Sequence, residues 1–498
     1  LRDIRDDAWR GLQEANNPPV LFCRDGVLVH LAGGGRRAPK LRQVTEKWML
    51  GRLASVARWY RYAGVGDETV KVDCLPPDAL AGVLVADPVP DLPELDAIVA
   101  SPVFDEAGRL VARPGYHPGA RLWYHRPPGF DLPTIPDVPL QEEVDTAVAY
   151  LFDHVLGEFP FAGDPDRAHA LAAIVLPFVR RMIDGCTPLH LCEAPTPGSG
   201  KTYLTEIINV LVTGERGSTT RITMNEEENT KTLAAVLLRA PTIIRLDNIA
   251  TGIDSSVLAE VLTTTEWECR ILGVTQTVVF PNQVLWCATA NNPTLSREVA
   301  RRTVRIRINP KMECPETRKF ANPKRLEWVM EHRAEILGHV FTIIRAWVVG
   351  GCRRLNIIHG GFNAWAGVIG GILDVARVPG LLENQSQLYE MADDETSIWR
   401  ELVAAWWAKF GNRWARVKDL LELCQDQDLL GKVIQDKTPR SQQTRLGKAL
   451  KGMRDRQFDG KTILAEIERA SKRWQYRLAE ENEEKPPVRP DAKQETIW

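Results

Sequence analysis

Hydrophobic and polar positions change their period several times along the 498 residues, and each change predicts a different kind of structure. In "PVLFCRDGVLVHL" two apolar runs flank Asp25-Gly26, a combination that favours a two-residue β-hairpin. The stretches "SPVFDEAGRLV" and "GYHPGARLWYH" repeat this pattern, and the Arg- and Trp-rich residues 47–62 favour a helix. We therefore expect a small β-rich domain at 1–126.

Five prolines within 127–139 interrupt this pattern, which is typical of a stiff linker. Farther along, short apolar runs alternate with helical patterns, and "LHLCEA", "TRITM", "TIIRLD", "VLWCATA" and "VRIRI" are predicted strands. Strands that alternate with helices indicate an α/β fold with a parallel sheet and flanking helices. The predicted division is a β-rich domain (1–126), a Pro-rich linker (127–140), a helical collar (141–187), an α/β core (188–310), a helical region (311–411), a small C-terminal domain (412–478) and a disordered tail (479–498).

A nearly complete phosphate-binding motif lies near the start of this core. Residues 194–202 read APTPGSGKT, whereas a P-loop reads G-x-x-x-x-G-K-[ST], so Pro195 stands where the first glycine belongs. The motif lies between a strand candidate and an amphipathic helix, an order that directs backbone N–H groups and a helix N-terminus at phosphates. The predicted ATP-binding residues are Pro197, Gly198, Ser199, Gly200, Lys201, Thr202 and Tyr203, with Lys201 on the β- and γ-phosphates and the Thr202 hydroxyl on Mg²⁺.

Asp247, at the end of the apolar run "PTIIRLD", is the second predicted residue for Mg²⁺, acting through water. The usual residue after such an aspartate is a glutamate that positions the attacking water, and here it is Asn248. Either Asn248 orients the water, or a carboxylate elsewhere does so. Glu226, Glu227 and Glu228 follow the second strand candidate, and the sequence does not choose among them.

Two further groups complete the candidate site. The strand "VLWCATA" leads into Asn291 and Asn292, whose amides can sense the γ-phosphate or orient water. A short helical run then carries Arg301 and Arg302 directly before the last strand, where an arginine can point into the site of a neighbouring subunit. A basic surface helix is the alternative interpretation of this pair.

The order and spacing of APTPGSGKT, IIRLDN, WCATANN and VARRTVRIRI resemble an AAA+ ATPase module. More closely, residues 140–410 resemble the helicase module of primase-helicase proteins from phages, plasmids and integrated elements. The resemblance implies a homo-oligomeric ring, a hexamer, with ATP and Mg²⁺ between subunits. It leaves open a primase partner or an upstream primase domain, because this chain shows no acidic primase cluster.

Helicases of this type push a β-hairpin into the central channel of the ring, and "RILGVTQTVVFPN" fits such a hairpin. Its predicted tip residues, Thr275 and Gln276, and the nearby Arg270 are candidate contacts to single-stranded DNA. A purely structural hairpin is the alternative, because the tip has no Lys or Arg and phosphate contacts dominate DNA affinity.

A second candidate DNA contact lies near the C-terminus. Arg445, Lys448, Lys451 and Arg454 recur every three residues along one side of a predicted helix. Residues 440–477 hold 11 Lys or Arg against four Asp or Glu, in a chain whose net charge is −2. A basic helix followed by a strand and a wing-like segment is typical of a winged helix that binds duplex DNA, and a solvated basic face is the alternative.

Cysteine usage and hydropathy limit the other possibilities. Nine scattered cysteines without a C-x-x-C pair predict reduced thiols, a cytoplasmic location and neither disulfides nor a zinc site. The longest apolar run near the middle, residues 336–352, contains His339 and Arg345 and is too short and too polar to span a membrane.

These features together predict an ATP-dependent, ring-forming DNA helicase or translocase that acts in replication of a mobile element. Two alternatives stay open. One is an ATP-switched DNA-binding initiator or assembly factor, which hydrolyses slowly because Asn248 is not a base. The other is a structural or defence-related ring whose nucleotide only holds subunits together.

Overall fold

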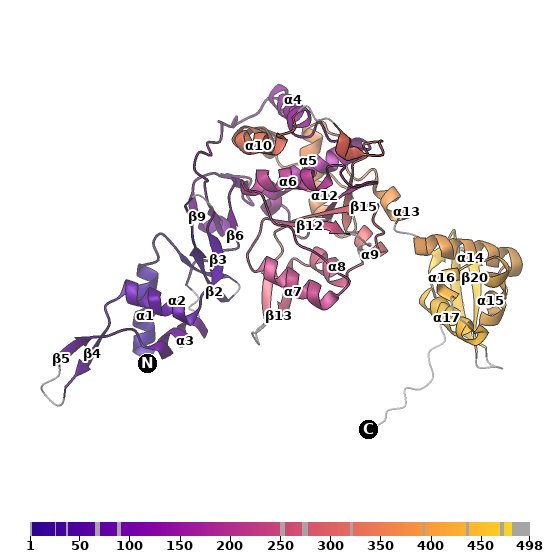
Figure 1. Cartoon of the computed structure of the whole chain (residues 1–498), viewed down its shortest axis with the longest axis horizontal. Coiled ribbons are helices and arrows are strands. Elements are labelled where there is room, and N and C mark those ends of the chain that lie inside the picture. Colours follow the sequence, from indigo (N-terminus) through magenta and orange to yellow (C-terminus); the bar gives the residue numbers. More distant parts are fainter. Residues whose placement is uncertain are drawn as a thin grey trace. The chain divides into compact units, whose positions relative to one another are not determined.

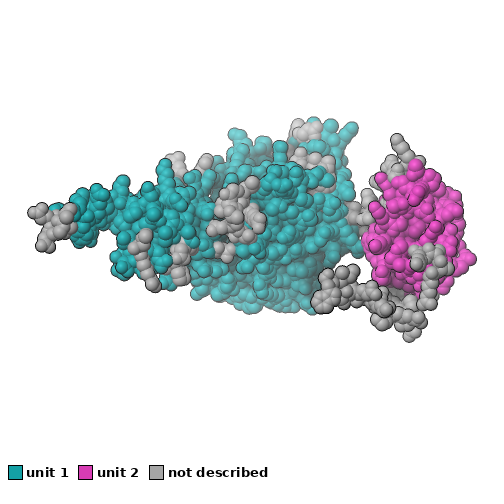
Figure 2. All heavy atoms as spheres, turned by 90° about the horizontal axis from the view of Figure 1, so that it is seen from below, with its two compact units in different colours: residues 1–389 teal, residues 390–498 magenta. Residues whose placement is uncertain are grey.

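The computed structural model describes residues 2–24, 26–35, 38–64, 70–86, 91–249, 254–270, 277–318, 322–391, 394–434, 438–468 and 473–480. They group into two compact units, residues 1–389 and 390–498, which Figure 2 shows in different colours. Each unit has its own buried apolar core and is described by itself. In the part of the chain that the structure describes, no helix is both long and apolar enough to cross a membrane.

The N-terminal region of the first unit combines helices with short antiparallel sheets (Figure 1). Its helices are α1 (Arg2–Glu14), α2 (Glu46–Val56) and α3 (Asp78–Ala86), of which the sequence pattern predicts only α2. Strands β1 (Leu21–Arg24), β2 (Val27–Ala32) and β3 (Lys40–Gln43) form one antiparallel sheet. Arg24 pairs with Val27 across the turn, which confirms the hairpin predicted around Gly26.

The helix predicted at 47–62 ends earlier than expected. Helix α2 begins after Thr45, whose hydroxyl accepts a hydrogen bond from Trp48 N, and it ends at Val56. The last predicted helical residues lie instead in strand β4 (Tyr60–Ala63), which pairs with β5 (Val70–Asp73). Closely spaced aromatic residues favour an extended strand over a helix, which explains the difference.

Two further predicted hairpins of this region are confirmed. Strand β7 (Val103–Phe104) pairs with β8 (Leu110–Val111), and β9 (Gly115–His117) pairs with β10 (Leu122–Tyr124). Strand β10 also pairs in parallel with β6 (Ala97–Val99).

A four-stranded parallel sheet lies at the centre of the first unit, in the order β12-β15-β11-β16. Its strands are β12 (Ile243–Ile249), β15 (Leu285–Asn291), β11 (Leu189–Ala194) and β16 (Thr303–Arg307). Every residue of β11 is buried, as expected for a parallel strand with both faces covered. The α/β class predicted for this region is therefore confirmed, and the sheet is compatible with a P-loop core.

The strand predicted at 220–224 is reduced to a single bridge beside β12. Thr220 N donates to Arg245 O at 2.7 Å, and Asp247 N donates to Thr220 O at 3.3 Å. Farther along, the side chain of Asn229 binds both backbone groups of Thr223. Because those groups are satisfied locally, they need no neighbouring strand.

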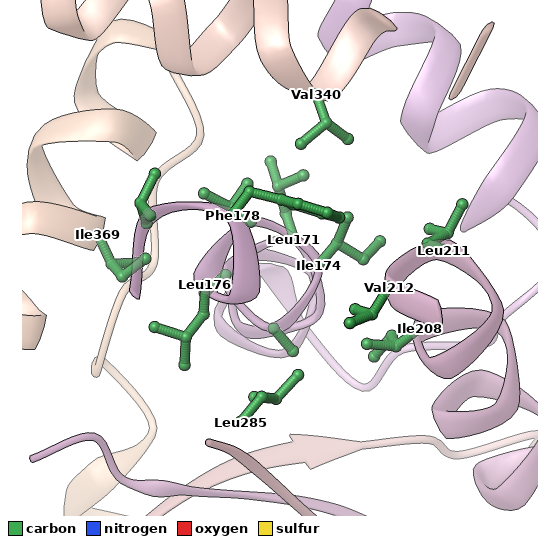
Figure 3. Close-up of a cluster of buried hydrophobic side chains, with 14 of the residues drawn as sticks. Leu171, Ile174, Leu176, Phe178, Ile208, Leu211, Val212, Leu285, Val340 and Ile369 are labelled. Atoms are coloured by element: carbon green, nitrogen blue, oxygen red, sulfur yellow. The ribbon is translucent and has the colours of Figure 1, made fainter. Parts of the chain in front are cut away.

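Helices surround the parallel sheet. In chain order, the sheet is preceded by α4 (Gln141–Tyr150), a π-helical turn (Leu151–Val155) and α5 (Asp164–Val179). The segments that connect its strands contain α6 (Lys201–Thr213), α7 (Glu226–Leu237), α8 (Ser256–Thr263) and α9 (Arg297–Ala300). The chain then continues through α10 (Arg325–Glu331), α11 (Arg333–Val349), α12 (Asn363–Val375) and α13 (Gln385–Met391). Figure 3 shows Leu171, Ile174 and Phe178 of α5 among apolar side chains of α6, α11, α12 and β15. Helix α5 is buried on nearly all sides, so it forms the centre of this core.

The hairpin predicted at 270–282 is present, and its first strand lies earlier than expected. Strand β13 (Glu266–Arg270) pairs antiparallel with β14 (Thr277–Pro281). Trp267 and Phe280 lie opposite each other and are both buried, which anchors the base of the hairpin in apolar surroundings.

The second unit packs helices against an antiparallel sheet of order β17-β20-β19-β18. Its elements are α14 (Asp394–Phe410), β17 (Ala415–Arg416), α15 (Val417–Asp426), α16 (Gly431–Ile434), α17 (Pro439–Gly452), β18 (Gln457–Phe458), β19 (Lys461–Ile467) and β20 (Trp474–Glu480). Trp399 and Trp406 of α14 are buried in the same core as Leu446 and Leu450 of α17. Helix α14 therefore belongs to this unit, whereas the sequence pattern places residues up to 411 with the preceding helical region.

Candidate nucleotide site

The predicted nucleotide-binding elements converge where the parallel strands end. Parallel strands end at the same edge of a sheet, so β11 leads into the loop 195–200, β12 carries Asp247, and β15 carries Asn291 to that edge. The register pairs Ala194 of β11 directly with Asn291 of β15. The structure thus brings the P-loop candidate, the predicted Mg²⁺ aspartate and the first predicted amide into one place.

The loop after β11 passes through two glycines before helix α6 begins. Gly198 and Gly200 have φ angles of 74° and 96°, in the left-handed region that favours glycine. Lys201 is the first residue of this 13-residue helix, whose first N–H groups have no partner within the helix. A glycine turn that leads into a helix N-terminus is the backbone geometry that binds phosphate, and Pro195 precedes both features.

The other predicted loop residues differ in their exposure. Pro197 is exposed, whereas Ser199 is buried and donates its hydroxyl to Thr196 O. Tyr203 is half-buried, and its hydroxyl accepts a hydrogen bond from Leu326 N at 2.7 Å. That hydroxyl therefore joins α6 to α10 within the protein itself.

Lys201 is 7% exposed and faces the end of β15. Its amine donates to Asn291 Oδ1 at 2.6 Å and to Thr196 O at 3.1 Å. Burial lowers the pKa of the Lys201 amine, and the nearby Cys192 and Asp247 oppose that shift. A buried ammonium held by two neutral oxygens gains strongly from an anionic ligand, which suits a phosphate-binding role.

Asp247 connects the P-loop helix to β15. Its Oδ1 accepts hydrogen bonds from the Thr289 hydroxyl at 2.6 Å and from the Thr202 hydroxyl at 3.1 Å. A carboxylate beside a threonine hydroxyl supplies the hard oxygen ligands that Mg²⁺ prefers. Thr202 is exposed and Asp247 half-buried, so the residues present fit a magnesium ion that a nucleotide brings with it.

One glutamate considered as a substitute for a catalytic glutamate serves as a helix cap. Glu226 Oε2 accepts hydrogen bonds from the hydroxyls of Ser255 and Ser256 and from Val257 N, at the start of α8. This carboxylate is therefore already used to satisfy the N-terminus of a helix.

The other two candidate glutamates pair with a lysine of their own helix. Lys231 Nζ lies 2.8 Å from Glu227 Oε1 and 3.0 Å from Glu228 Oε1. Asn248 lies within strand β12, and its side chain is outside the described residues. The contacts found for the three glutamates are with α8 and with Lys231, so none of these contacts assigns the water-activating role to a glutamate.

The two arginines predicted to act on a neighbour lie at the opposite edge of the sheet. Strand β16 runs parallel to β11, so Arg301 and Arg302 precede its amino end, and five residues at about 3.3 Å each separate them from the P-loop edge. Arg302 is held by Glu298, to whose carbonyl it donates at 2.6 Å. Arg301 is exposed, and its side chain bonds to no other residue that the structure describes.

An arginine that the sequence analysis did not single out lies at the P-loop edge instead. Arg307, the last residue of β16, donates to Glu193 Oε1 at 2.6 Å and to Asn292 Oδ1 at 3.3 Å. Glu193 is 1% exposed and lies one residue before the end of β11. The strand-end argument that selects Asp247 also selects Arg307 in "TVRIR", so the signal was present in the sequence.

The DNA contacts predicted at the hairpin are only partly described. Thr275 and Gln276 lie outside the described residues, and only the backbone of Arg270 is described, at the end of β13.

The basic residues predicted in the C-terminal domain lie on the surface of the second unit. Arg445, Lys448 and Lys451 are exposed on α17, while Leu446 of the same helix is buried. Arg454 follows the helix and lies 3.3 Å from Asp455. The helix therefore presents three cations on the side away from its core.

Among the residues that the structure describes, thiols and potential metal ligands form no further site. All nine cysteines are free thiols. The described residues contain no group of three or more His, Cys, Asp or Glu side chains that could hold a metal ion.

Comparisons with known proteins give little beyond this geometry. No protein-family model matches the chain, and no curated protein matches it. One similar solved structure is a crystal structure of JCV helicase bound to a thiazolopyridine-containing phenoxyphenyl acetamide, with 13% sequence identity over 54% of this chain and 72% of that chain, and a TM-score of 0.22. A likeness at this level carries no argument about function, so the function is inferred from the site itself.

Proposed function

We propose that this protein is an ATPase of the AAA+ type, which assembles into a ring and moves along DNA as a helicase or translocase. One observation carries the proposal. The Lys201 amine donates a hydrogen bond to Asn291, and the Thr202 hydroxyl donates one to Asp247. These two bonds join the start of helix α6 to the ends of the neighbouring strands β15 and β12. A chance resemblance to a P-loop would not bring these four residue types together at one edge of a sheet.

Each of these residues suits one task in phosphoryl transfer. Lys201 neutralises the β- and γ-phosphates, and Thr202 and Asp247 hold Mg²⁺. Asn291 senses the γ-phosphate, because its amide is bonded to the lysine that binds the phosphates. Bound ATP with Mg²⁺ supplies the reactive phosphoryl group, and the protein positions it and stabilises its charge.

The position of Arg301 supports a homo-oligomer, which we propose to be a hexamer. The residue is exposed at the amino edge of the sheet, one strand length from its own P-loop. An arginine at this edge can contribute to hydrolysis only by contacting the nucleotide of a neighbouring copy. Arg302, the next residue, is proposed to act with it. The resemblance to primase-helicase proteins adds two further parts to the proposal. The protein acts in replication of a mobile element, and it works with a primase partner or an upstream primase domain.

Two surfaces are proposed to bind DNA. The β13–β14 hairpin, with Arg270, Thr275 and Gln276, contacts single-stranded DNA in the channel. The second unit is proposed to be a winged helix that binds duplex DNA through α17, whose exposed Arg445, Lys448 and Lys451 can each meet a phosphate. Arg454 extends this row beyond the end of the helix.

A slow, ATP-switched DNA-binding protein is the second candidate function. It is favoured by one specific observation: Glu226, Glu227 and Glu228 are all engaged away from the P-loop, and Asn248 follows the Mg²⁺ aspartate. Without a carboxylate base, binding of ATP can outlast its hydrolysis, and the bound state then acts as the signal.

Measurement of ATP turnover with and without single-stranded DNA tests the proposal. We expect turnover that DNA stimulates and that Lys201→Ala abolishes, while the surface variant Lys231→Ala keeps it. Tight ATP binding without turnover, in the presence of DNA, would contradict the motor and support the switch. Strand displacement of a forked duplex then separates a helicase from an ATPase that does not move.

A further inference from the structure

Two neighbouring amides at the end of β15 have different partners. Asn291 accepts a hydrogen bond from Lys201, at the phosphate-binding side. Asn292 accepts one from Arg307 at 3.3 Å, and Arg307 in turn donates to Glu193 at 2.6 Å. We propose that Arg307 is a positioning residue, which fixes the Asn292 amide beside the P-loop by anchoring it to the buried Glu193 carboxylate.

The anchor is fixed because Glu193 is buried and charged. Only 1% of the residue is exposed, and among the described residues its Oε2 has no hydrogen-bond partner. The Arg305 guanidinium lies 3.8 Å from Oε1, so Arg307 makes the closer ion pair. A buried carboxylate holds its cationic partner strongly, since separation would leave a charge without compensation.

The backbone fixes both ends of the link. Arg307 N donates to Asp166 Oδ1 at 2.8 Å, and Arg307 O accepts from Ala162 N at 2.9 Å. Asn292 N donates to Ala194 O at 3.1 Å, directly before the P-loop. The guanidinium therefore spans two strand ends whose backbones are already held in place.

Only an arginine suits this span. A guanidinium presents several N–H groups in a rigid plane, so it can bind a carboxylate with one nitrogen and an amide oxygen with another. A lysine keeps the charge beside Glu193 but is a compact point charge, which cannot maintain both contacts.

The link predicts an effect on turnover that is separate from ATP binding. Lys201 contacts Asn291 and not Asn292, so phosphate binding does not depend on Arg307. The Asn292 amide is exposed, so it is accessible to the γ-phosphate or the attacking water. It can act on either group only if its orientation is fixed, which is the role proposed for Arg307. This inference rests on the proposed ATP hydrolysis at the site.

A double-mutant cycle in the full-length protein tests the inference. Arg307→Lys keeps the charge beside Glu193, and Asn292→Gly removes the amide at a φ of 37°, where glycine fits without strain. We expect each variant to lower kcat by about 10- to 100-fold with KM almost unchanged, because a misplacement of about 1 Å can cost roughly 100-fold in rate. The kcat of the double variant should be no lower than that of the slower single variant.

Arg216→Lys is the control. This exposed arginine pairs with Glu327 at 2.7 Å, away from Glu193 and Asn292, so kcat should stay within about twofold of the wild type. If Arg307→Lys does not fold, an unchanged kcat in Asn292→Gly still overturns the positioning role, because this variant lies at an exposed position.

The outcomes separate this inference from the proposed function. Wild-type turnover together with an unchanged kcat in Arg307→Lys or Asn292→Gly overturns the positioning role alone. The same conclusion follows if the two single effects multiply in the double variant, or if KM rises in parallel with the loss of kcat. A wild type without any turnover overturns the proposed ATPase, and the positioning role with it.

Discussion

The two edges of the parallel sheet differ in how their charged residues are held. At the carboxyl edge, Lys201, Asp247 and Arg307 are each hydrogen-bonded to a neighbouring strand end or to the P-loop helix. At the amino edge, Arg301 is exposed and bonded to no described side chain. The same sheet therefore separates the groups that we propose to bind the chain's own nucleotide from the arginine that we propose to act on another copy.

The difference has an energetic meaning. A buried charge interacts strongly with its neighbours because little water screens it, so the carboxyl edge is organised before any ligand arrives. An exposed arginine contributes almost nothing by itself, since water and salt screen it. In the proposed ring, a second subunit would cover Arg301 and remove that water, and only then would the arginine have a large effect.

Replacement of Arg301 should have the largest effect and tests the amino edge. If the guanidinium acts on a neighbour's nucleotide, Arg301→Ala lowers ATP turnover by about 10³- to 10⁵-fold. Mixed into wild-type protein, the variant should reduce activity more steeply than its fraction. ATP turnover across a series of mixing ratios measures this.

Arg302→Ala is the control for that experiment, because the guanidinium of Arg302 is already bonded to Glu298. We expect a smaller loss and a more proportional decline in mixtures. Activity that falls in simple proportion to the fraction of Arg301→Ala would show that the amino edge has no role in a neighbouring site.

Asp247→Asn tests the carboxyl edge. The amide keeps the hydrogen bonds with Thr289 and Thr202 within reach but removes the negative charge that favours Mg²⁺. The Mg²⁺ concentration for half-maximal turnover should rise by about 10- to 100-fold, the usual size of an outer-shell effect on metal affinity. A Mg²⁺ titration that matches the wild type would remove Asp247 from the ion site.

Acid should weaken the core that both edges share. Burial lowers the pKa of the His169 and His359 imidazoles to about 4, and that of the His190 imidazole to about 3. Between these values and the ordinary 6.5, the unfolded chain binds protons that the folded chain does not, so stability is complete above pH 6.5 and is lost as pH falls. Each imidazole should cost about 2 kcal/mol at pH 5, which denaturant unfolding at a series of pH values can measure.

His190→Leu separates this cause from general acid sensitivity. The residue is completely buried on β11 beside Trp365, where an apolar side chain fits its surroundings. The pH-dependence of unfolding should become shallower in the variant. An identical slope would place the acid sensitivity in other groups.

Replacement of Glu227 should have the smallest effect. Its carboxylate is exposed and pairs with Lys231, so Glu227→Gln should change turnover by no more than about twofold, as for most surface substitutions. A loss of 100-fold in steady-state turnover would instead identify Glu227 as the group that activates water, and would revise the interpretation of Asn248.

Much of the site follows from sequence pattern, because strand ends in a parallel sheet share one edge. Strand ends are predicted at or directly before APTPGSGKT, Asp247 and Asn291, and these segments do converge. Their roles toward ATP and Mg²⁺ stay predictions.

Other features depend on which strands are neighbours, and sequence pattern does not show that order. Strand β16 lies beside β11, and only this pairing brings Arg307 to Glu193 and Asn292. The use of Glu226 as a cap for α8 depends likewise on a contact between residues far apart in the chain.

The binding of a non-hydrolysable MgATP analogue to wild type, Lys201→Ala and Arg301→Ala tests the difference between the two edges most directly. Lys201→Ala removes the buried ammonium of the carboxyl edge, and we expect it to weaken binding by about 100-fold or more, equivalent to roughly 2.7 kcal/mol. Arg301→Ala should bind the analogue nearly as well as the wild type. Equal affinity of Lys201→Ala and wild type would contradict the nucleotide site proposed at the carboxyl edge.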